Sequence, residues 1–355
     1  MEKSIIIDAT HLAGDRPTGV EAYVCGLLPP LSERLMSAGW KVAWVGHEPA
    51  SAIGMPAGVE WILSPHRRFW SQTALTRLLY ARKPDLFFTP SGIPPLLYRG
   101  ATALTVHDMG AYVDPMAYSP SQLARLRPML RRAVRHASLV TVPSEFTAHQ
   151  LADFWHKPSV VAYPAYNLPA KLDAEPVAGI REPFLLFVGR LERKKNLITL
   201  VRGFAKLEDS ALQLVLAGKD GYGIKALRAE IAKLPVEISN RILLPGYITE
   251  GQKKWLYERA LAVTVPCLFE GFGIPILEAF AYRAPVICSQ SGSLPEVGGD
   301  AACYVQGDIA TDWQLQIKKV ADDAELRKAM VAKGSQRLKE FSWDNAASSI
   351  VTALS

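Results

Sequence analysis

The 355-residue sequence lacks the features that define several large classes of protein. Only four cysteines occur and none forms a Cys-x-x-Cys pair, so neither a disulfide framework nor a zinc finger is expected. The apolar runs are shorter than the roughly 18–20 residues that a membrane-spanning helix needs. The N-terminal apolar stretch is too short for a signal peptide, and Asp8 ends it. These absences predict a cytosolic protein with buried, reduced thiols at Cys25, Cys267, Cys288 and Cys303.

Three motifs of ligand binding are missing as well. The chain contains no Asp-x-Asp and no cluster of His, Asp and Glu at metal-ligand spacing, so no metal ion is expected. There is no Gly-x-Gly-x-x-Gly fingerprint, which disfavours a nicotinamide cofactor. Gly218-Lys219-Asp220-Gly221 lacks the Lys-Ser/Thr ending of a P-loop, although such a glycine-rich turn suits a base or a ribose.

Positive charge is present and unevenly distributed. The net charge is +6, and residues 61–140 hold eleven Lys or Arg against three Asp or Glu. Residues 66–83 have the pattern of a basic amphipathic helix, and Arg127, Arg131 and Arg135 fall on one face of a second helix within 125–135. These basic residues have three interpretations: two solvated helix faces, a surface that binds an anionic membrane or acceptor, or a surface that binds nucleic acid. Because no nucleic-acid-binding motif occurs, we expect no nucleic-acid partner.

Short apolar β-branched runs alternate with helical patterns in the first half of the chain. This alternation predicts a doubly wound α/β domain over residues 1–168. The expected strands are Ser4–Ile7, Val42–Gly46, Leu86–Thr89, Ala103–Val106 and Leu139–Val142, and the expected helices are Val20–Leu28, 71–82, 121–136 and 145–154.

A proline-rich stretch, Tyr163–Glu182, interrupts the pattern and is predicted to be a linker. The alternation then restarts and predicts a second α/β domain over residues 180–339. Its expected elements are Phe184–Val188, Leu197–Leu207, Leu212–Ala217, Lys225–Leu234, Ile242–Leu244, Glu250–Ala260, Ala262–Val265, Pro275–Tyr282 and Pro285–Cys288, with Trp343–Leu354 as a final amphipathic helix. Two such domains are expected to face a cleft in which ligands bind beyond the carboxyl ends of the strands.

The most informative loop is Pro266–Ala279. An apolar strand ends, Gly271 and Gly273 form a turn, and Pro275 suits the first position of a new helix. Helix N-termini bind phosphate through free N–H groups and a partial positive charge. Glu270 and Glu278 flank this turn, and their carboxylates suit the hydroxyls of a sugar.

Two further strand ends carry polar groups. Gly189 ends the first strand of the second domain, and four cations follow within six residues, among them Arg190 and Lys195, which are placed to neutralise a diphosphate. His107 and Asp108 end a strand of the first domain; a lone histidine is more often structural, but a strand end favours a functional role. Near the N-terminus, the turn before the first helix could present backbone N–H groups to an anion.

At these residues the chain resembles the retaining family-four glycosyltransferases of GT-B architecture. The matching segments follow the family's order and span nearly the whole chain. They are Thr18–Tyr23, Val106–Asp108, Val142–Phe146, Gly189–Asn196, Pro245–Tyr247, Glu270–Glu278 and Ser291–Glu296. Val142-Pro143-Ser144 departs slightly from the family's Val-Ser. The resemblance also implies that a last helix, within 340–355, crosses back to the first domain.

The resemblance implies a role for each matching residue. His107, Glu270, Arg190 and Lys195 are the implied catalytic residues, with Glu270 binding hydroxyls of the transferred sugar and Glu278 binding the ribose. The implied donor-binding set is Gly19, Asp108, Gly189, Arg190, Lys195, Gly218, Phe272, Gly273, Ile274, Leu277 and Glu278. The implied substrates are a nucleotide diphosphate sugar and a glycan or lipid-linked glycan acceptor, without cofactor or metal.

The reaction expected from this resemblance is hexosyl transfer with retention, in bacterial surface-polysaccharide synthesis at the inner face of the membrane. Mannose from GDP-mannose is the first candidate, and glucose from UDP-glucose is the second. A sugar-nucleotide epimerase, a phosphorylase and a binding module without turnover are the alternatives; a phosphorylase would need a longer chain and a pyridoxal-binding lysine. Because Glu270 is needed for sugar hydroxyls, we expect same-face attack rather than a covalent intermediate.

Overall fold

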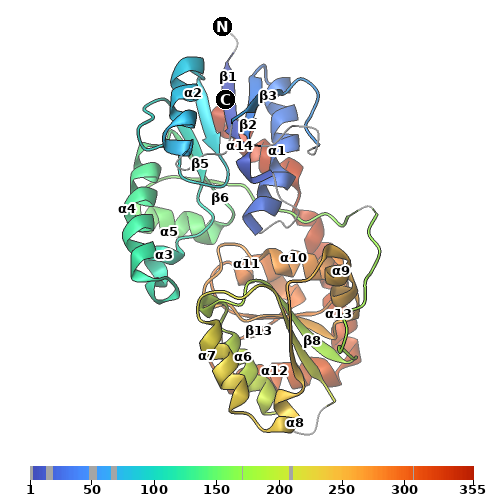
Figure 1. Cartoon of the computed structure of the whole chain (residues 1–355). Coiled ribbons are helices and arrows are strands. Elements are labelled where there is room, and N and C mark those ends of the chain that lie inside the picture. Colours follow the sequence, from blue (N-terminus) through green and yellow to red (C-terminus); the bar gives the residue numbers. More distant parts are fainter. Residues whose placement is uncertain are drawn as a thin grey trace. The chain divides into compact units, whose positions relative to one another are not determined.

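The computed structural model describes residues 3–12, 19–47, 54–64, 70–169, 171–207, 211–306 and 308–355. Its contacts divide the chain into two compact units. Unit 1 comprises Met1–Val113, Ser119–Ala165 and Phe341–Ser355, and unit 2 comprises Asp114–Tyr118 and Tyr166–Glu340. Each unit is a parallel sheet flanked by helices, so the protein has a two-domain Rossmann-like α/β fold (Figure 1).

Unit 1 contains a seven-stranded sheet of order β3-β2-β1-β4-β5-β6-β7, in which every pairing is parallel. The strands are β1 (Ser4–Asp8), β2 (Lys41–Gly46), β3 (Glu60–Leu63), β4 (Leu86–Thr89), β5 (Thr102–Thr105), β6 (Leu139–Val142) and β7 (Val160–Val161). Apolar residues fill both faces, as parallel sheets covered by helices require.

Serine side chains cap the N-termini of three helices of unit 1. The Ser119 hydroxyl accepts a hydrogen bond from Gln122 N, and the Gln122 side-chain oxygen accepts one from Ser119 N, which completes a capping box. The helical segments are η1 (Thr10–Leu12), α1 (Gly19–Ser37), η3 (Trp70–Gln72), α2 (Ala74–Arg82), α3 (Gly110–Val113), α4 (Pro120–His136), α5 (Glu145–Trp155) and α14 (Trp343–Leu354).

Helix α14 comes from the C-terminal end of the sequence but packs on α1 within unit 1 (Figure 1). Gly26 permits this contact, because a Cβ at that position would overlap the indole of Trp343. The Trp343 ring also lies 5.6 Å from the ring of Tyr23, edge to face. Ala346, Ala347 and Ile350 are buried in the same core.

Unit 2 contains a six-stranded parallel sheet of order β10-β9-β8-β11-β12-β13. Its strands are β8 (Phe184–Val188), β9 (Gln213–Ala217), β10 (Ile242–Gly246), β11 (Ala262–Val265), β12 (Val286–Ser289) and β13 (Ala302–Val305). Its helical segments are η4 (Pro115–Ala117), η5 (Arg193–Lys195), α6 (Leu197–Ala205), α7 (Ile224–Ala232), α8 (Val236–Ser239), α9 (Glu250–Arg259), α10 (Ile274–Ala281), α11 (Leu294–Gly298), η6 (Gly299–Ala301), α12 (Ala310–Asp322), α13 (Ala324–Arg337) and η7 (Leu338–Glu340).

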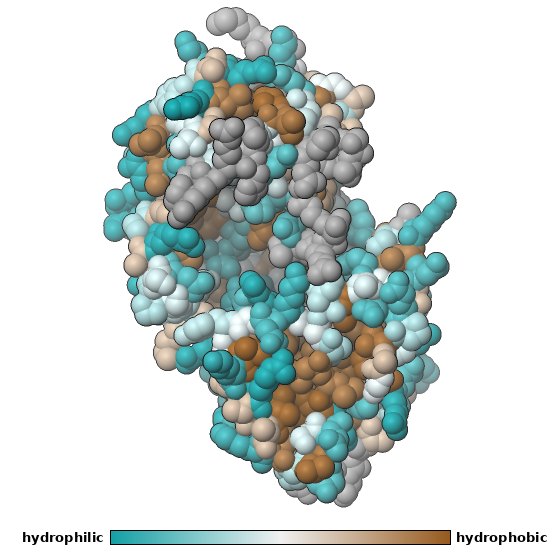
Figure 2. Space-filling view, viewed as in Figure 1, coloured by the Kyte–Doolittle hydropathy of each residue, from teal (hydrophilic) through white to brown (hydrophobic). Residues whose placement is uncertain are grey.

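The core of unit 2 is built from strands β8, β9 and β11 and the helices that cover them. Phe204 and Trp313 are fully buried there, and Gly203 lets α6 approach α12. Figure 2 shows apolar side chains gathered on the visible face of unit 2, bordered by hydrophilic ones. No helix among the described residues combines the length and hydropathy that crossing a bilayer requires.

Several sequence predictions need correction. The first helix was expected to end at Leu28, before two prolines, but α1 contains Pro29 and Pro30 and continues to Ser37 because its apolar face remains buried beyond them. Cys25 is exposed rather than buried, since it lies on the outer face of α1. Helix α10 begins at Ile274, so Pro275 is its second residue.

Other differences are omissions. The alternation did not predict β3, β7 or β13, and it did not predict helices α12 and α13, whose ranges fell in stretches left without an assigned element. Residues 66–69, which were expected to begin a basic helix, lie outside the described residues; α2 begins at Ala74.

Candidate functional site

The candidate site of unit 2 lies at the carboxyl ends of its two central strands. β8 is the first strand of this sheet; the chain then adds β9 and β10 on one side and β11 to β13 on the other. The direction in which successive strands are added therefore reverses between β8 and β11. In such sheets the loops that follow the two strands at this point form the ligand crevice. Gly189–Lys195 follows β8, and Pro266–Gly273 follows β11.

The loop after β11 is held in shape by the loop after β12. The hydroxyl of Ser293 donates to the backbone oxygens of Glu270, at 2.9 Å, and Phe272, at 2.8 Å. Ser291 likewise donates to the oxygen of Leu268. Gly292 has a φ of +61°, and a Cβ there would lie 2.6 Å from the oxygen of Glu270, so only glycine fits.

This bracing fixes the start of α10. Gly273 adopts a φ of +111° and ends the turn, and the helix runs from Ile274. The first backbone N–H groups of an α-helix have no partner within the helix, and the helix dipole makes that end attractive to anions. Phe272 is buried beside the turn, whereas Leu277, one turn into the helix, is fully buried in the core.

Lys195 and Glu270 form a close ion pair at this helix start. Lys195 Nζ lies 2.5 Å from Glu270 Oε2, and the two side chains are 15% and 21% exposed. The thiol of Cys267 donates to the same oxygen, at 3.2 Å. Among the described residues, Lys195 and Cys267 both donate to Oε2 of the carboxylate.

Burial and neighbouring charges shift the pKa values of Lys195, Glu270 and Cys267. Burial alone would lower the pKa of Lys195, but Cys267 and Glu270 outweigh it and raise that pKa. Burial would raise the pKa of Glu270, but Lys195 and Lys194 outweigh it and lower that pKa. Burial raises the pKa of the Cys267 thiol to about 12. At neutral pH the site therefore holds an ammonium, a carboxylate and a neutral thiol.

Glu278 lies on α10 and is engaged from another helix. Tyr257 of α9 donates to Glu278 Oε2 at 2.6 Å, and Lys253 Nζ lies 3.1 Å from Oε1. The sequence analysis missed both Lys253 and Tyr257. Their signal was their four-residue spacing, which puts two polar side chains on one helix face. Glu278 therefore sits in a formed polar cluster rather than on an open surface.

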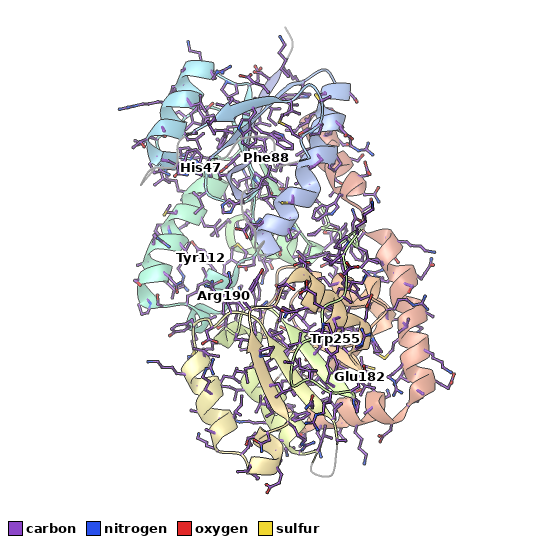
Figure 3. All side chains as sticks on the ribbon, turned by 45° about the vertical axis from the view of Figure 1, so that its right-hand side comes forward. His47, Phe88, Tyr112, Glu182, Arg190 and Trp255 are labelled. Atoms are coloured by element: carbon purple, nitrogen blue, oxygen red, sulfur yellow. The ribbon has the colours of Figure 1, made fainter. Side chains whose placement is uncertain are left out.

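Arg190 follows β8 in unit 2 (Figure 3). The Arg190 side chain is 64% exposed, with Nε 3.5 Å from Glu192 Oε1, so the structure does not show it in the Lys195–Glu270 pair. Gly189 and Gly218 have positive φ, and a Cβ on Gly218 would overlap the oxygen of Gly189. At this point the two loops touch backbone to backbone.

Three predicted residues belong to unit 1. His107 follows β5; its Nε2 lies 2.7 Å from the oxygen of Pro90, and its ring packs against Tyr23 at 4.9 Å. Burial lowers the pKa of His107. The Asp108 carboxylate accepts from Gly110 N at 2.9 Å, which caps a turn. Gly19 is exposed at the first position of α1, and no heavy atom lies within 4 Å of a Cβ built there.

The basic residues of the predicted surface patch are partly committed to internal contacts. Arg82 pairs with Glu60 at 2.9 Å, and Arg132 donates to Leu96 O at 3.1 Å. Arg127 donates to Ala111 O at 2.8 Å and stacks over the Tyr112 ring. These contacts tie α2 and α4 to their own unit, and Glu60 offsets part of the charge of Arg82.

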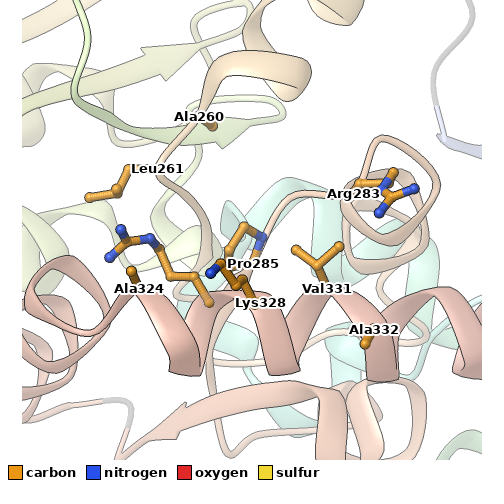
Figure 4. A pocket seen from close by; sticks show the side chains of 9 residues that line it. Ala260, Leu261, Arg283, Pro285, Ala324, Lys328, Val331 and Ala332 are labelled. Carbon is orange, nitrogen blue, oxygen red and sulfur yellow. The ribbon is translucent and has the colours of Figure 1, made fainter.

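A pocket of about 460 Å³ lies elsewhere in unit 2 (Figure 4). It is lined by Ala260 and Leu261 before β11, Pro285 before β12, and residues of α13. It therefore opens at the amino ends of these strands, opposite the candidate site, and no carboxylate lines it. We assign function to the strand-end loops, where charged groups converge. No three His, Cys, Asp or Glu side chains in the described ranges form a group that could hold a metal.

The fold and this arrangement define a class. A helix N-terminus suits phosphate groups, and a lysine and a carboxylate suit phosphate and hydroxyl groups respectively. Residues 18–168 match the family model Glycosyltransferase Family 4, and residues 172–337 match Glycosyl transferases group 1. The chain belongs to the family-four type of glycosyltransferase and is a transferase enzyme.

Similar proteins agree with this assignment. O-antigen chain mannosyltransferase B of Escherichia coli is 26% identical over 309 residues, covering 82% of this chain and 78% of that protein. O-antigen chain mannosyltransferase RfbU of Salmonella typhimurium is 28% identical, covering 70% and 68%.

Solved structures show the same fold over the whole chain. Sucrose-phosphate synthase of Thermosynechococcus elongatus superposes with a TM-score of 0.73 at 21% identity, covering 99% of this chain and 98% of the other. WaaG, a glycosyltransferase of lipopolysaccharide biosynthesis, gives 0.71 at 14% identity, covering 98% of each chain.

Proposed function

We propose that this glycosyltransferase moves a mannosyl group from GDP-mannose, with retention and without a metal ion, to a saccharide or lipid-linked saccharide. The observation that carries the proposal is the Lys195–Glu270 pair at the start of α10. It places an ammonium group, a carboxylate and helix N–H groups together, as a sugar attached to a diphosphate requires.

In the proposed reaction, departure of the diphosphate is the step that needs stabilisation. The bond from the anomeric carbon to the β-phosphate oxygen breaks and leaves negative charge on that phosphate. Lys195, Arg190 and the N-terminus of α10 stabilise this charge before and during departure. The protein itself supplies the positive charge, so the chemistry does not require Mg²⁺.

Glu270 has the complementary task. Lys195 and Cys267 hold Oε2, and Oε1 accepts hydrogen bonds from hydroxyls of the transferred sugar. A carboxylate so engaged is a poor nucleophile, which favours attack by the acceptor oxygen on the face that the diphosphate leaves. The acceptor proton moves to the departing phosphate oxygen. A trapped glycosyl ester on Glu270 would contradict this step.

The choice of mannose is supported by the two O-antigen mannosyltransferases described above. Glucose from UDP-glucose is the second candidate, because HepE of Anabaena, solved in complex with UDP and glucose, shares the fold with a TM-score of 0.70 at 18% identity and covers 99% of each chain. A sugar-nucleotide epimerase is the third candidate; it would convert the donor without an acceptor.

The deciding experiment measures product formation with GDP-mannose and UDP-glucose, each with and without a mixture of saccharide and lipid-linked saccharide acceptors. We expect a glycosylated product only when GDP-mannose and acceptor are both present. Conversion of the donor sugar without acceptor would identify an epimerase, and transfer from UDP-glucose alone would identify a glucosyltransferase. Retention is read from the anomeric configuration of the product by NMR.

Independence of metal is tested separately. We expect the rate in excess EDTA to match the untreated rate, because Lys195 and Arg190 neutralise the leaving group. A rate that vanishes in EDTA and returns on adding Mg²⁺ or Mn²⁺ would overturn this part of the proposal and leave the donor assignment intact.

We also propose that the enzyme works in the cytosol at an anionic membrane surface, where a lipid-linked acceptor would be met. The support is the excess of Arg and Lys over residues 61–140. Co-sedimentation with vesicles that contain anionic lipid, compared with neutral vesicles, measures this binding directly. Equal sedimentation with both would contradict it.

A further inference from the structure

Glu278, the second carboxylate of the motif, is surrounded by polar side chains that have no role in the proposed reaction. Tyr257 donates to Oε2 at 2.6 Å, and Lys253 Nζ lies 3.1 Å from Oε1. Both partners come from α9, one helical turn apart, and face α10 together. Glu278 is 9% exposed and Tyr257 is fully buried, so neither group turns freely.

A further layer holds these two partners in place. Lys253 Nζ also pairs with Glu250 at 2.8 Å and lies 5.6 Å from the centre of the Tyr166 ring. The Tyr257 ring stacks on Tyr282 at 5.4 Å with an interplanar angle of 22°. The side chain of Lys253 is only 14% exposed, which is unusual for a lysine on a short helix.

The ionisation of the two partners suits them to hold a carboxylate. Burial alone would lower the pKa of Lys253, but Glu278 and Glu250 outweigh it and raise that pKa. Burial raises the pKa of Tyr257, and the charge of Glu278 raises it further. Near neutral pH, Lys253 is therefore an ammonium donor and Tyr257 a neutral hydroxyl donor.

The hydrogen-bonding capacity that remains on Glu278 is well defined. Each carboxylate oxygen can accept about two hydrogen bonds. Within the described part of the chain, Lys253 takes one position on Oε1 and Tyr257 one on Oε2, which leaves one acceptor position on each oxygen. Two acceptors at the fixed spacing of a carboxylate match two neighbouring hydroxyl groups, such as those of a ribose.

We propose that Lys253 and Tyr257 are positioning residues that orient Glu278 so that its two oxygens accept the 2′- and 3′-hydroxyls of the donor ribose. This inference rests on the proposed function, in which the donor is a ribonucleoside diphosphate sugar. It adds that selection of ribose over deoxyribose depends on α9 as well as on α10. Lys253 and Tyr257 do not touch the sugar; they act through Glu278.

The experiment compares ribonucleotides with deoxyribonucleotides as ligands of the full chain. Calorimetry measures the Kd of GDP and UDP, and of their 2′-deoxy and 3′-deoxy forms, for the wild type, Tyr257→Phe and Lys253→Met. For the wild type we expect removal of either hydroxyl to weaken binding about tenfold or more, as loss of a hydrogen bond to a charged group does.

In both variants we expect the ratio of the deoxynucleotide Kd to the ribonucleotide Kd to fall to about threefold or less, because a Glu278 side chain that can rotate no longer offers two aligned acceptors. This ratio is the discrimination between the two ligands. Ribonucleotide binding should weaken, while deoxynucleotide binding should stay near the wild-type value. A merely structural role would weaken both ligands equally and leave their ratio unchanged.

Two matched controls remove the same chemical groups elsewhere in unit 2. Tyr304→Phe deletes a hydroxyl that donates to Gly299 O at 2.7 Å, and Lys254→Met deletes the neighbouring ammonium, which donates to Leu172 O at 2.8 Å. We expect both to keep the wild-type discrimination. Lys253→Arg, which retains the charge, should recover part of the discrimination that Lys253→Met loses.

Each outcome has a distinct meaning. If both variants keep the wild-type discrimination, the positioning role is wrong although the proposed function stands. If the wild type itself does not distinguish ribose from deoxyribose, Glu278 does not bind the diol. If the wild type binds neither nucleotide, the proposed function fails and this inference with it. Should Tyr257→Phe not fold, Lys253→Met decides alone.

Discussion

The Lys195–Glu270 ion pair is part of the folded structure and, in the proposed function, also acts on the substrate. Taking two charges out of water costs several kcal/mol, and their attraction offsets this cost only when the geometry is good. A spacing of 2.5 Å and the added thiol bond from Cys267 meet that condition. The pair keeps both groups charged and in place before a substrate arrives, and the proposed reaction needs this state to stabilise the leaving diphosphate.

The first prediction follows from that pair. Lys195→Ala and Glu270→Ala should each lower turnover at least about 100-fold, because each removes a contact to the reacting sugar or diphosphate. Steady-state rates together with far-UV circular dichroism measure the effect and confirm that the variants are folded. Arg228→Ala, which removes an exposed pair with Asp220 in the same unit, is the control and should keep wild-type turnover. Wild-type turnover in either site variant would refute the assignment.

His107 makes a prediction about pH and stability. Its Nε2–H donates to Pro90 O, and burial lowers its folded pKa below the ordinary value of 6.5. Below pH 6.5 the unfolded chain takes up this proton before the folded chain does, so lowering the pH costs stability. The loss grows until the pH passes below the folded pKa.

The measurement compares thermal midpoints of the wild type and His107→Gln between pH 7.5 and about 5, a range that brackets the imidazole titration. Glutamine can keep the bond to Pro90 O but does not titrate. We expect the midpoint of the wild type to fall further than that of the variant. Parallel curves for the two proteins would show that His107 does not titrate differently on folding.

At the scale of single elements, the loops after β8 and β9 depend on glycine. Gly189 and Gly218 both have positive φ, and Gly218 N donates to Gly246 O at 2.7 Å, which continues the sheet contact into the loops. The backbones touch so closely that no side chain fits between them. This contact sets the path of the chain toward Lys195.

Gly218→Ala should therefore destabilise the protein by about 2–4 kcal/mol, the sum of a strained φ and an overlap with backbone that cannot move aside. Urea unfolding measures the change. Gly39→Ala is the matched control, since Gly39 also has positive φ but no heavy atom within 4 Å of a Cβ. It should cost only about 1 kcal/mol. Equal losses in the two variants would show that strain alone, not the close approach, matters at Gly218.

At the scale of the whole molecule, the last fifteen residues complete the core of the first unit. Phe341–Ser355 groups with unit 1, and α14 packs along α1 through Trp343, Ala346 and Ile350. Without them, Tyr23 and the apolar side of α1 would face water.

A chain truncated after Glu340 should accordingly lose stability in unit 1 while unit 2 stays folded. Calorimetric unfolding of the truncated chain is expected to show an earlier transition for unit 1, and limited proteolysis should cut that unit first. The substitution Ile350→Ala leaves a cavity in the same core. It should lower the free energy of unfolding of unit 1 by about 2–5 kcal/mol. An unchanged transition after truncation would contradict the structural role of α14.

The sequence alone predicted the two-domain α/β fold, because apolar runs of four or five residues and helical periods depend on local composition. It also predicted that Arg190, Lys195 and Glu270 lie together in one crevice, since the ends of parallel strands meet at one edge of a sheet; the structure pairs Lys195 with Glu270. The sequence did not predict the full length of helix α1. Pro29 and Pro30 indicate a helix end locally, but burial of the apolar face stabilises the helix beyond them.

Only the tertiary structure decided which charged groups are partners. It pairs Glu270 with Lys195 and leaves Arg190 largely exposed, although the two cations are five residues apart. It brings Lys253 and Tyr257 to Glu278, which lies on a different helix. A local pattern gives the direction of a side chain from its own strand or helix. The side chain that it contacts on another element is decided by how the elements pack. That packing depends on contacts between residues far apart in the sequence.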